Sequence, residues 1–324
     1  MSLLSSSANQ ALPAGRRAEQ RGLVGLYLQL AKARLSALVL LTAAVGFIMA
    51  SPRGAGIDWV RLLLTVVGTG LAAGAANALN QVIEARRDEL MQRTRDRPLP
   101  SRAIGRGHAV IFSLVTACAG LAILALAVNL AAAGLALATI CIYVGLYTPL
   151  KTRSTLNTIV GAVCGAIPPM IGWVAATGSL DPGAWILGTL LFVWQIPHFF
   201  ALAWLYRDDY ARGGFVMLPV VDRTGRLTGQ VVVLTSLSLV PLALAATLAG
   251  LSGLVYAAGS VLLGLWILGF GARLYAQRTE ASARRLFLAS ILYLPILLCL
   301  MVADRGHIEG ATVGARAVAS APAE

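Results

Sequence analysis

Long apolar stretches separated by short polar connections follow one another along most of the chain. Each stretch is close to the length that an α-helix needs to cross about 30 Å of hydrocarbon, roughly 20 residues. Nine can be delimited, at 23–50, 59–83, 109–128, 130–147, 157–177, 184–206, 229–250, 252–273 and 286–303. The pattern predicts an all-α, polytopic membrane protein, a bundle of nine transmembrane helices.

The composition supports this interpretation. Of the 324 residues, 58% are hydrophobic and 12% are charged, which is too apolar for a soluble globular domain. The four cysteines fall inside apolar stretches without the paired spacing of a zinc site or a disulfide framework. We expect one intramembrane domain over residues 23–303, with a flexible cytoplasmic tail at 1–22 and a flexible non-cytoplasmic tail at 304–324.

Basic residues gather at alternate ends of the predicted helices, and this sets the orientation. Cytoplasmic loops of membrane proteins carry an excess of Lys and Arg. All but four of the 26 basic residues fall on one face, and the other face keeps only Arg53, Arg61, Arg305 and Arg316. We therefore expect a multi-pass protein of the cell (inner) membrane, with its N-terminus in the cytoplasm and its C-terminus outside. The net charge of +12 then reflects topology and gives no support to nucleic-acid binding.

Two connections are longer than the rest, at roughly 84–108 and 207–228, and both lie on the predicted cytoplasmic face. Long loops confined to one face of a bundle tend to carry function. The Gly- and Pro-rich stretch 161–173, which contains Pro168 and Pro169, is expected to bend the fifth helix and to let neighbouring helices approach closely. Together these features predict an active-site cavity that opens toward the cytoplasm.

Asn77, Asn80, Glu84 and Asp88 are spaced so that they share one side of a helix at its cytoplasmic end. Carboxylate oxygens are the hard ligands that Mg²⁺ prefers, and Mg²⁺ often binds one or two carboxylates together with substrate phosphates. The spacing therefore predicts a Mg²⁺ site at Glu84 and Asp88 that a diphosphate completes. The alternative is that these side chains only solvate a helix end at the interface.

Cationic side chains follow in the first long loop and after the fourth predicted helix. Arg93 and Arg97 in the first loop, with Lys151 and Arg153 after the fourth predicted helix, could surround an anionic group with charge-assisted hydrogen bonds. They could instead be membrane anchors that contact anionic lipid, which is the more common use of such residues.

Four stretches of the chain resemble the motifs of a known family. The stretch 80–100, with Asn80, Glu84 and Asp88 followed by Arg93 and Arg97-Pro98, resembles the signature of the intramembrane aromatic prenyltransferase superfamily. Three further stretches, 147–155, 194–202 and 206–219, resemble its protohaem IX farnesyltransferase (haem O synthase) branch. The resemblance covers roughly residues 25–303.

The resemblance implies a bundle of nine transmembrane helices that transfers a farnesyl group from farnesyl diphosphate to a vinyl group of haem b. It also implies the lipid bilayer as surroundings, and a haem a synthase or an oxidase assembly factor as a possible partner. Asn80, Glu84 and Asp88 would hold Mg²⁺ and diphosphate, and Arg93, Arg97, Lys151 and Arg153 would neutralise the leaving group. The implied substrate-binding residues also include Asn77, Tyr147, His198, Arg207, Asp208, Asp209 and Tyr210.

The chain departs from the wider superfamily in two places. Asp208 and Asp209 are adjacent, whereas many members space these two aspartates four residues apart. This leaves open whether a second Mg²⁺ is bound directly, and by which of the two. Glu84 stands where many relatives have Asp, and its longer side chain should still reach the metal.

His198 is the only histidine inside an apolar stretch. An ionisable residue at membrane depth is by default a functional hypothesis, so His198 could ligate haem iron or hold a propionate. The alternative is a core histidine bonded to a backbone carbonyl. Trp194, Phe199, Phe200 and Trp204 could line a porphyrin slot, or they could be ordinary packing residues.

Two rival functions remain open from the sequence. One is prenyl transfer to another aromatic acceptor, such as a quinone precursor or a chlorophyll-like ring, which the stretches 197–199 and 206–210 disfavour. The other is a secondary transporter, although transporters usually carry internal repeats and charged helices near the bilayer midplane. Here the charges cluster at one interface and no clear repeat is visible.

Overall fold

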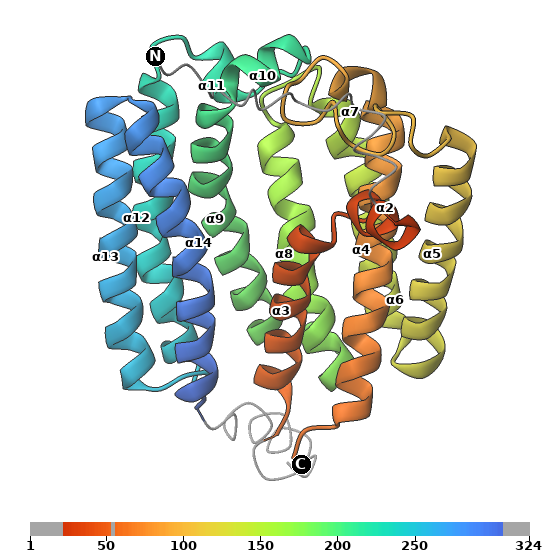
Figure 1. The fold of residues 1–324 in the computed structure, drawn as a ribbon. Helices are drawn as coiled ribbons and strands as arrows, with labels where there is room; N and C mark the ends of the chain where they lie inside the picture. The colour runs from red at the N-terminus through yellow and green to blue at the C-terminus, as the bar shows by residue number, and fades with distance from the viewer. Residues whose placement is uncertain (1–21, 53–55, 307–324) are drawn as a thin grey trace, which may run out of the picture.

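The computed structural model describes residues 22–52 and 56–306, and this part of the chain is a bundle of α-helices joined by short connections (Figure 1). The helices are α2 (Leu23–Leu30), α3 (Ala33–Ala50), α4 (Trp59–Asp88), α5 (Arg106–Ala127), α6 (Leu130–Cys141), a π-helical segment η1 (Ile142–Tyr147), α7 (Thr148–Leu150), α8 (Asn157–Thr177), α9 (Pro182–Leu205), α10 (Arg207–Arg212), α11 (Leu218–Val221), α12 (Arg226–Leu248), α13 (Leu254–Gln277) and α14 (Glu280–Ala303).

Eight helices in the described ranges are long and apolar enough to cross a membrane, and α6, η1 and α7 together form one of them. The ninth expected span, 23–50, is not one helix. It breaks at Ala31 and Lys32, where Lys32 adopts a left-handed backbone with φ of 50°, so that α2 and α3 are separate helices. The prediction of an all-α membrane bundle is therefore confirmed, and the prediction of a continuous first helix is wrong. A single left-handed residue suffices because it redirects the chain without continuing the helical hydrogen bonds.

Local sequence signals explain where several helices begin. The side chain of Asp58 accepts a hydrogen bond from the backbone N–H of Arg61 at 2.9 Å and caps α4. Asn129 caps α6 in the same way and separates α5 from α6, as the sequence predicts for the 109–147 region. Thr279 and Ser282 form a reciprocal cap at the start of α14. Each cap satisfies backbone donors that a helix leaves free at its first turn.

Helices α3 and α8 approach one another closely, and glycine is what permits it. A Cβ atom at Gly172 of α8 would overlap the carbonyl oxygen of Ala43, and one at Gly46 of α3 would overlap the carbonyl oxygen of Pro169. Small residues at a helix interface let backbones meet inside a membrane. This confirms the close approach predicted from the stretch 161–173.

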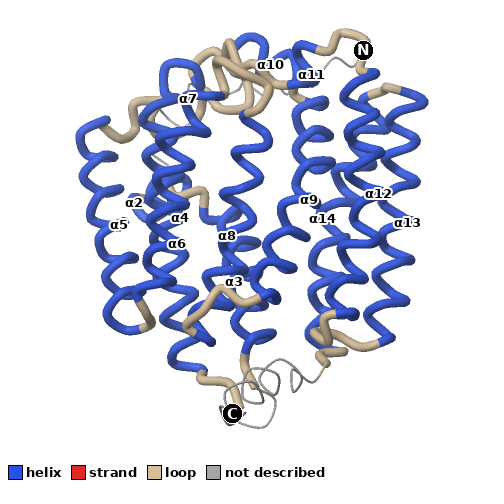
Figure 2. Tube along the Cα trace, turned by 180° about the vertical axis from the view of Figure 1, so that it is seen from behind, coloured by secondary structure: helices blue, strands red, loops and turns tan. Residues whose placement is uncertain are grey.

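The long helices stand roughly side by side, with α3 and α8 between the group α9, α12, α13 and α14 and the group α4, α5 and α6 (Figures 1 and 2). The short helices α7, α10 and α11 and the connections around them gather at one end of the bundle. Large apolar side chains such as Leu114, Leu262 and Leu265 are exposed on the outer helices, as expected for surfaces that face lipid. The polar loops therefore share one membrane boundary.

The two expected tails lie mostly outside the described residues, since 1–21 and 307–324 are not described. Residues 304–306 at the start of the expected C-terminal tail are hydrogen-bonded to the bundle. The Asp304 side chain accepts from the backbone N–H of Tyr256 at 2.7 Å, and Arg305 donates to the carbonyl oxygen of Ile48.

Candidate active site

Helix α4 carries the acidic residues of the site to the loop end of the bundle. The helix continues to Asp88, five residues past the end of the predicted apolar span, so the four expected polar residues stand on one unbroken helix. Asn80 and Asp88 are fully buried and Glu84 is 5% exposed, whereas Asn77 is half-buried. Two carboxylates are thus held away from water at the membrane boundary, where burial is costly unless a cation accompanies them.

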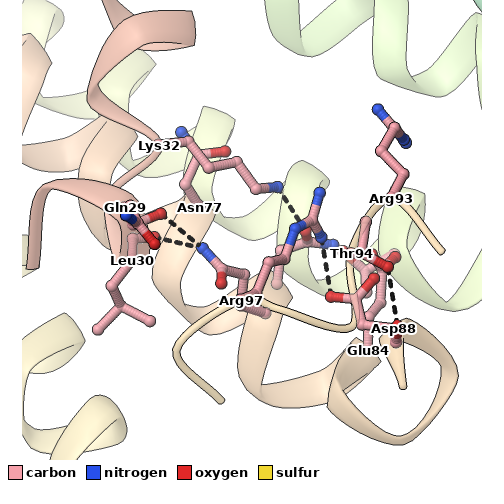
Figure 3. A network of polar contacts seen from close by, with 12 residues as sticks. Gln29, Leu30, Lys32, Asn77, Glu84, Asp88, Arg93, Thr94 and Arg97 are labelled. Carbon is pink, nitrogen blue, oxygen red and sulfur yellow. Dashed lines mark hydrogen bonds and ion pairs between the residues drawn. The ribbon is translucent and has the colours of Figure 1, made fainter. Parts of the chain in front are cut away.

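Each buried carboxylate is paired with one of the expected cations. Lys151 Nζ lies 2.8 Å from Glu84 Oε1, and Arg97 Nη1 lies 2.8 Å from Asp88 Oδ2. Figure 3 shows Arg97 reaching back from its loop to the acidic end of α4. The second oxygen of Asp88, Oδ1, is buried and accepts no hydrogen bond from any described residue. The site therefore holds one open carboxylate oxygen.

The π-helical segment and α7 bring Lys151 to this position. Thr148 Oγ1 donates to the carbonyl oxygen of Tyr143 at 2.7 Å and accepts from Asn80 Nδ2 at 3.1 Å, which fixes the segment against α4. Lys151 Nζ also lies 4.6 Å from the ring centroid of Tyr147. Burial lowers the pKa of Lys151, but the negative charge of Glu84 more than offsets this and raises the pKa above its ordinary value. Lys151 is therefore a permanent cation at neutral pH.

Lys32 belongs to the same cluster, although from the sequence it counts only among the basic residues that set the orientation. Its Nζ donates to Asn80 Oδ1 at 2.9 Å (Figure 3), and the chain folds back to this point at the break between α2 and α3. Among the described residues no carboxylate forms an ion pair with it. The only two lysines of the chain, Lys32 and Lys151, thus meet at one site. The signal that could have found Lys32 is a charged residue in the interior of an apolar stretch.

The two long loops are joined through Asp209 of α10. Its carboxylate accepts the backbone N–H groups of Gln92 at 3.0 Å and Arg93 at 3.1 Å, and it pairs with Arg212. Burial would raise the pKa of Asp209, but these hydrogen bonds and the Arg212 charge hold it below the ordinary value. Asp209 therefore stays ionised and fixes the loop that carries Arg93 and Arg97.

The side chain of Arg93 contacts Tyr210 and Tyr206. Arg93 Nη2 donates to the hydroxyl of Tyr210 at 3.1 Å, and its guanidinium lies 4.7 Å from the centroid of the Tyr206 ring. Arg93 itself is exposed and pairs with no carboxylate in the described ranges. It is a second cation at the boundary without an acidic partner.

The remaining predicted residues lie further out. Arg153, Arg207 and Asp208 are exposed, and Arg207 Nε is 3.9 Å from Asp208 Oδ1. Asp208 and Asp209 therefore differ although they are adjacent, because only Asp209 points into the junction of the loops. Among residues 22–52 and 56–306, no group of three His, Cys, Asp or Glu side chains could hold a metal by itself.

A cavity of about 280 Å³ lies below the charged cluster, between α3, α4, α6, η1, α8 and α9. Its wall is mostly apolar and includes Ala72, Ala76, Ile140 and Leu191, while Lys32, Asn77 and Tyr143 stand at the junction with the charged cluster. An anionic head beside Lys32 and an apolar tail in the cavity would suit this arrangement. Of the features from which the sequence predicts a cavity, the fifth predicted helix, which is α8, lines it, whereas the two long loops do not.

His198 lines the same cavity, together with Trp194 and Phe199. The ring of His198 stacks with that of Trp194 at 5.1 Å between centroids, and its Nδ1 lies 2.8 Å from the hydroxyl oxygen of Ser290. The expected backbone carbonyl partner is thus replaced by a side-chain hydroxyl. Phe200 and Trp204 are buried but do not line the cavity.

The residues present fit a Mg²⁺ ion that a substrate helps to bind. Glu84 and Asp88 supply hard oxygen donors, and Asp88 Oδ1 is buried without a hydrogen-bond partner among residues 22–52 and 56–306. Two carboxylates alone do not make a full coordination shell, and Mg²⁺ ordinarily completes it with waters and substrate phosphates. The donor set therefore fits Mg²⁺ bound jointly with a diphosphate.

The protein is an all-α membrane bundle with acidic and cationic side chains at the mouth of an apolar cavity. This arrangement defines a membrane enzyme for substrates with a charged head and a long apolar tail. Residues 39–314 match the UbiA prenyltransferase family, and the chain belongs to this family.

Three curated relatives show how close the similarity is, and each is named protoheme IX farnesyltransferase. The Solibacter usitatus protein is 43% identical over 286 residues, which cover 86% of this chain and 98% of the relative. The Salinibacter ruber protein is 41% identical over 278 residues, covering 86% and 98%. The mitochondrial protein of Homo sapiens is 43% identical over 292 residues, which cover 90% of this chain and 65% of the human protein.

Solved structures share the fold at low identity. A structure of a digeranylgeranylglyceryl phosphate synthase superposes with a TM-score of 0.73 at 17% identity, covering 88% of this chain and 99% of the other. A UbiA homolog from Archaeoglobus fulgidus bound to GPP and Mg²⁺ superposes with a TM-score of 0.60 at 14% identity, covering 85% and 99%. These two similarities confirm the fold.

Proposed function

We propose that this protein transfers a farnesyl group from farnesyl diphosphate to a vinyl carbon of haem b, giving haem o and diphosphate. The proposal rests on the relatives named protoheme IX farnesyltransferase, which are 41–43% identical over most of the chain. The single structural observation that carries it is the junction of a cation-rich polar cluster with an apolar cavity at Lys32 and Asn77. One substrate can thereby place its charge in the cluster and its chain in the cavity.

The diphosphate binds the cations of the cluster. Lys32 and Arg93 have no acidic partner among the described residues and are ready to receive an anion, while Lys151 and Arg97 are held in place by Glu84 and Asp88. Fixed cations near a departing anion stabilise charge as it develops, where water is scarce. Asn80 donates and accepts between Lys32 and Thr148 and holds this arrangement together.

Glu84 and Asp88 would hold Mg²⁺, through the open Oδ1 of Asp88 in particular. When bound, Mg²⁺ neutralises the diphosphate and makes it a better leaving group. A UbiA homolog has been seen with GPP and Mg²⁺ together, which supports the same pairing here. Lys151 and Arg97 then exchange their carboxylate partners for phosphate oxygens.

The reaction breaks the bond between the farnesyl C1 carbon and the diphosphate oxygen. The vinyl group of haem b supplies the electron pair for the new carbon–carbon bond, a water oxygen adds to the resulting cationic carbon, and that water loses one proton. The apolar wall, with Ala72, Ala76 and Ile140, keeps other water from the allylic carbon before the vinyl group reaches it. His198, Trp194 and Phe199 form the wall where the porphyrin binds, with His198 as a ligand of the iron.

The remaining predicted residues have supporting roles. Asn77, Tyr147 and Tyr210 border the cluster, and Asp209 positions the arginine loop; Arg153, Arg207 and Asp208 meet the substrate at the loop surface. The polar end of the bundle faces the cytoplasm, in the inner membrane of the cell, because basic residues concentrate there. Haem b would arrive from the membrane, and haem o would pass to a haem a synthase or an oxidase assembly factor.

The test is incubation of the purified protein with haem b, farnesyl diphosphate and Mg²⁺, followed by mass analysis of the pigment. A product heavier than haem b by one farnesyl group and one hydroxyl group supports the proposal. Farnesylation of a quinone precursor but not of haem would instead support transfer to another aromatic acceptor. Solute uptake by vesicles in the absence of any diphosphate would support transport.

A further inference from the structure

The hydrogen bond between His198 of α9 and Ser290 of α14 determines which ring nitrogen of the histidine carries its proton. The hydroxyl of Ser290 has one proton, and its Oγ lies 2.7 Å from the carbonyl oxygen of Phe287, which can only accept. That proton is therefore used, and Ser290 Oγ must accept from its other neighbour, His198 Nδ1 at 2.8 Å. These contacts assign to His198 the tautomer with the proton on Nδ1 and a free lone pair on Nε2.

The free nitrogen faces the cavity. In the described part of the chain, Nε2 of His198 makes no hydrogen bond, yet it is not among the buried atoms without a partner. His198 is half-buried and lines the cavity. A lone pair on an accessible imidazole nitrogen in a mostly apolar wall is suited to a transition metal, because neutral imidazole is a common ligand of iron.

The surroundings hold the imidazole in one orientation. The ring of Phe287 stacks on that of His198 at 4.9 Å between centroids, and the ring of Trp194 stacks on it at 5.1 Å. Trp194 Nε1 also donates to the backbone carbonyl oxygen of Ser290 at 3.0 Å. Ser290 is itself fully buried, so its hydroxyl does not exchange this partner for water. One residue of α14 therefore sets both the tautomer and the position of the cavity-facing histidine.

We propose that Ser290 is a positioning residue for haem: it fixes the His198 tautomer that presents Nε2 to the iron, and so sets the placement of the porphyrin. The inference rests on the proposed function, because it takes an iron porphyrin as the acceptor. A ligating histidine commonly donates its other N–H to an oxygen, and loss of such a partner typically weakens metal binding by about 10- to 100-fold. The hydroxyl here takes the part usually played by a carboxylate or a carbonyl oxygen.

The experiment is titration of the detergent-purified protein with ferrous haem b, with resonance Raman detection of the iron–histidine stretch. The wild type should show this band, and His198→Ala should lose it. Ser290→Ala should keep the band at lower frequency, since a weaker hydrogen bond at Nδ1 makes the imidazole a poorer donor, with haem affinity reduced about 10-fold or more. Ser290→Thr keeps the hydroxyl and should restore both.

The matched control is Ser260→Ala. Ser260 of α13 is also fully buried and bonds the carbonyl oxygen three residues earlier, that of Ala257 at 2.9 Å, but among the described residues it bonds no side chain of the cavity wall. It should leave the band and the affinity unchanged. If Ser290→Ala does not fold, Ser290→Cys replaces it, because a thiol has similar size and accepts hydrogen bonds weakly.

The results separate the two proposals. An iron–histidine band that is absent from the wild type, or present and unmoved in Ser290→Ala, overturns the role of Ser290. Mass analysis of the wild-type pigment decides the proposed function independently, because a farnesylated haem can form whether or not the band responds to Ser290. A band that shifts in Ser290→Ala, without any farnesylated product, would support the positioning role of Ser290 and contradict the proposed reaction.

Discussion

At the scale of single residues, Asp88 is the carboxylate with an open oxygen, Oδ1, and we expect it to be essential for turnover. Asp88→Asn should lower kcat by at least about 100-fold, because the amide supplies no negative charge to Mg²⁺ and weakens the pairing with Arg97. The measurement is farnesyl transfer as a function of Mg²⁺ concentration, with circular dichroism to show that the bundle is intact.

Asp96→Asn is the control for this change. Asp96→Asn is the same chemical change in the loop that follows α4, but the Asp96 side chain is exposed and forms no ion pair with any described residue. It should retain wild-type activity. A folded Asp88→Asn protein with normal Mg²⁺-dependent turnover would remove Asp88 from the metal site.

Lys32 is the residue for which the structure changes the expectation most. We expect Lys32→Met to raise KM for farnesyl diphosphate about 10-fold or more, because one charge-assisted hydrogen bond contributes about 1.5–3 kcal/mol. Lys32→Arg should recover most of this affinity, since the charge is kept. Steady-state kinetics of both variants, with haem saturating, is the measurement. An unchanged KM in Lys32→Met would remove Lys32 from the diphosphate site.

At the scale of elements, Asp209 joins the loop after α4 to α10. Asp209→Asn leaves one of the two backbone donors, Gln92 or Arg93, without its acceptor, so hydrogen-exchange protection of these amides should fall. Asp208→Asn, at an exposed neighbouring carboxylate, should leave their protection unchanged. Equal protection in the two variants would show that Asp209 does not fix the loop.

The stability of the same junction should fall in acid. The pKa of Asp209 is lower in the folded protein than its ordinary value of about 3.9. The stabilisation is therefore complete well above the ordinary pKa and is lost as the pH falls through the lowered pKa. Protection of the Gln92 and Arg93 amides, corrected for intrinsic exchange rates, should persist from pH 7 to pH 4. Its loss near pH 5 would contradict this.

The contact of α3 with α8 depends on glycine at its closest points. Gly172→Ala places a Cβ against the carbonyl oxygen of Ala43, so one backbone must move, at a cost of about 1–3 kcal/mol or more. The apparent Tm in detergent should fall by several degrees. Gly269→Ala in α13 adds the same methyl group where no atom of the described residues lies within 4 Å, and it should not lower the Tm.

At the scale of the whole molecule, the polar loops all gather at one boundary, which we expect to face the cytoplasm. After Cys118, Cys141, Cys164 and Cys299 are replaced by Ala, Ser179→Cys and Thr224→Cys each introduce an exposed thiol on opposite ends of the bundle. In spheroplasts a membrane-impermeant maleimide should label the thiol at position 179 and not the one at 224. Permeabilisation should expose both, and the reverse pattern would invert the topology.

Much of the architecture follows from the apolar pattern. Eight of the nine predicted spans form continuous long helices in the described ranges, because a backbone surrounded by lipid must satisfy its hydrogen bonds within each helix. The four polar residues of α4 were also predictable, since helical periodicity alone places Asn80, Glu84 and Asp88 on one side. The break at Lys32 was not, because the stretch 23–50 has neither Pro at that point nor a strong local signal for a left-handed residue.

By itself the sequence determined the membrane class, the helix order, the boundary that carries charge, and the motifs that mark a prenyltransferase, because each of these depends on neighbours within one or two helical turns. Only the tertiary structure decided that Lys151 pairs with Glu84 and Arg97 with Asp88, that Asp209 joins two loops, and that the hydroxyl of Ser290 lies beside His198 Nδ1. Those contacts join residues up to 117 positions apart. The packing of helices against one another sets such distances, and no local pattern encodes them.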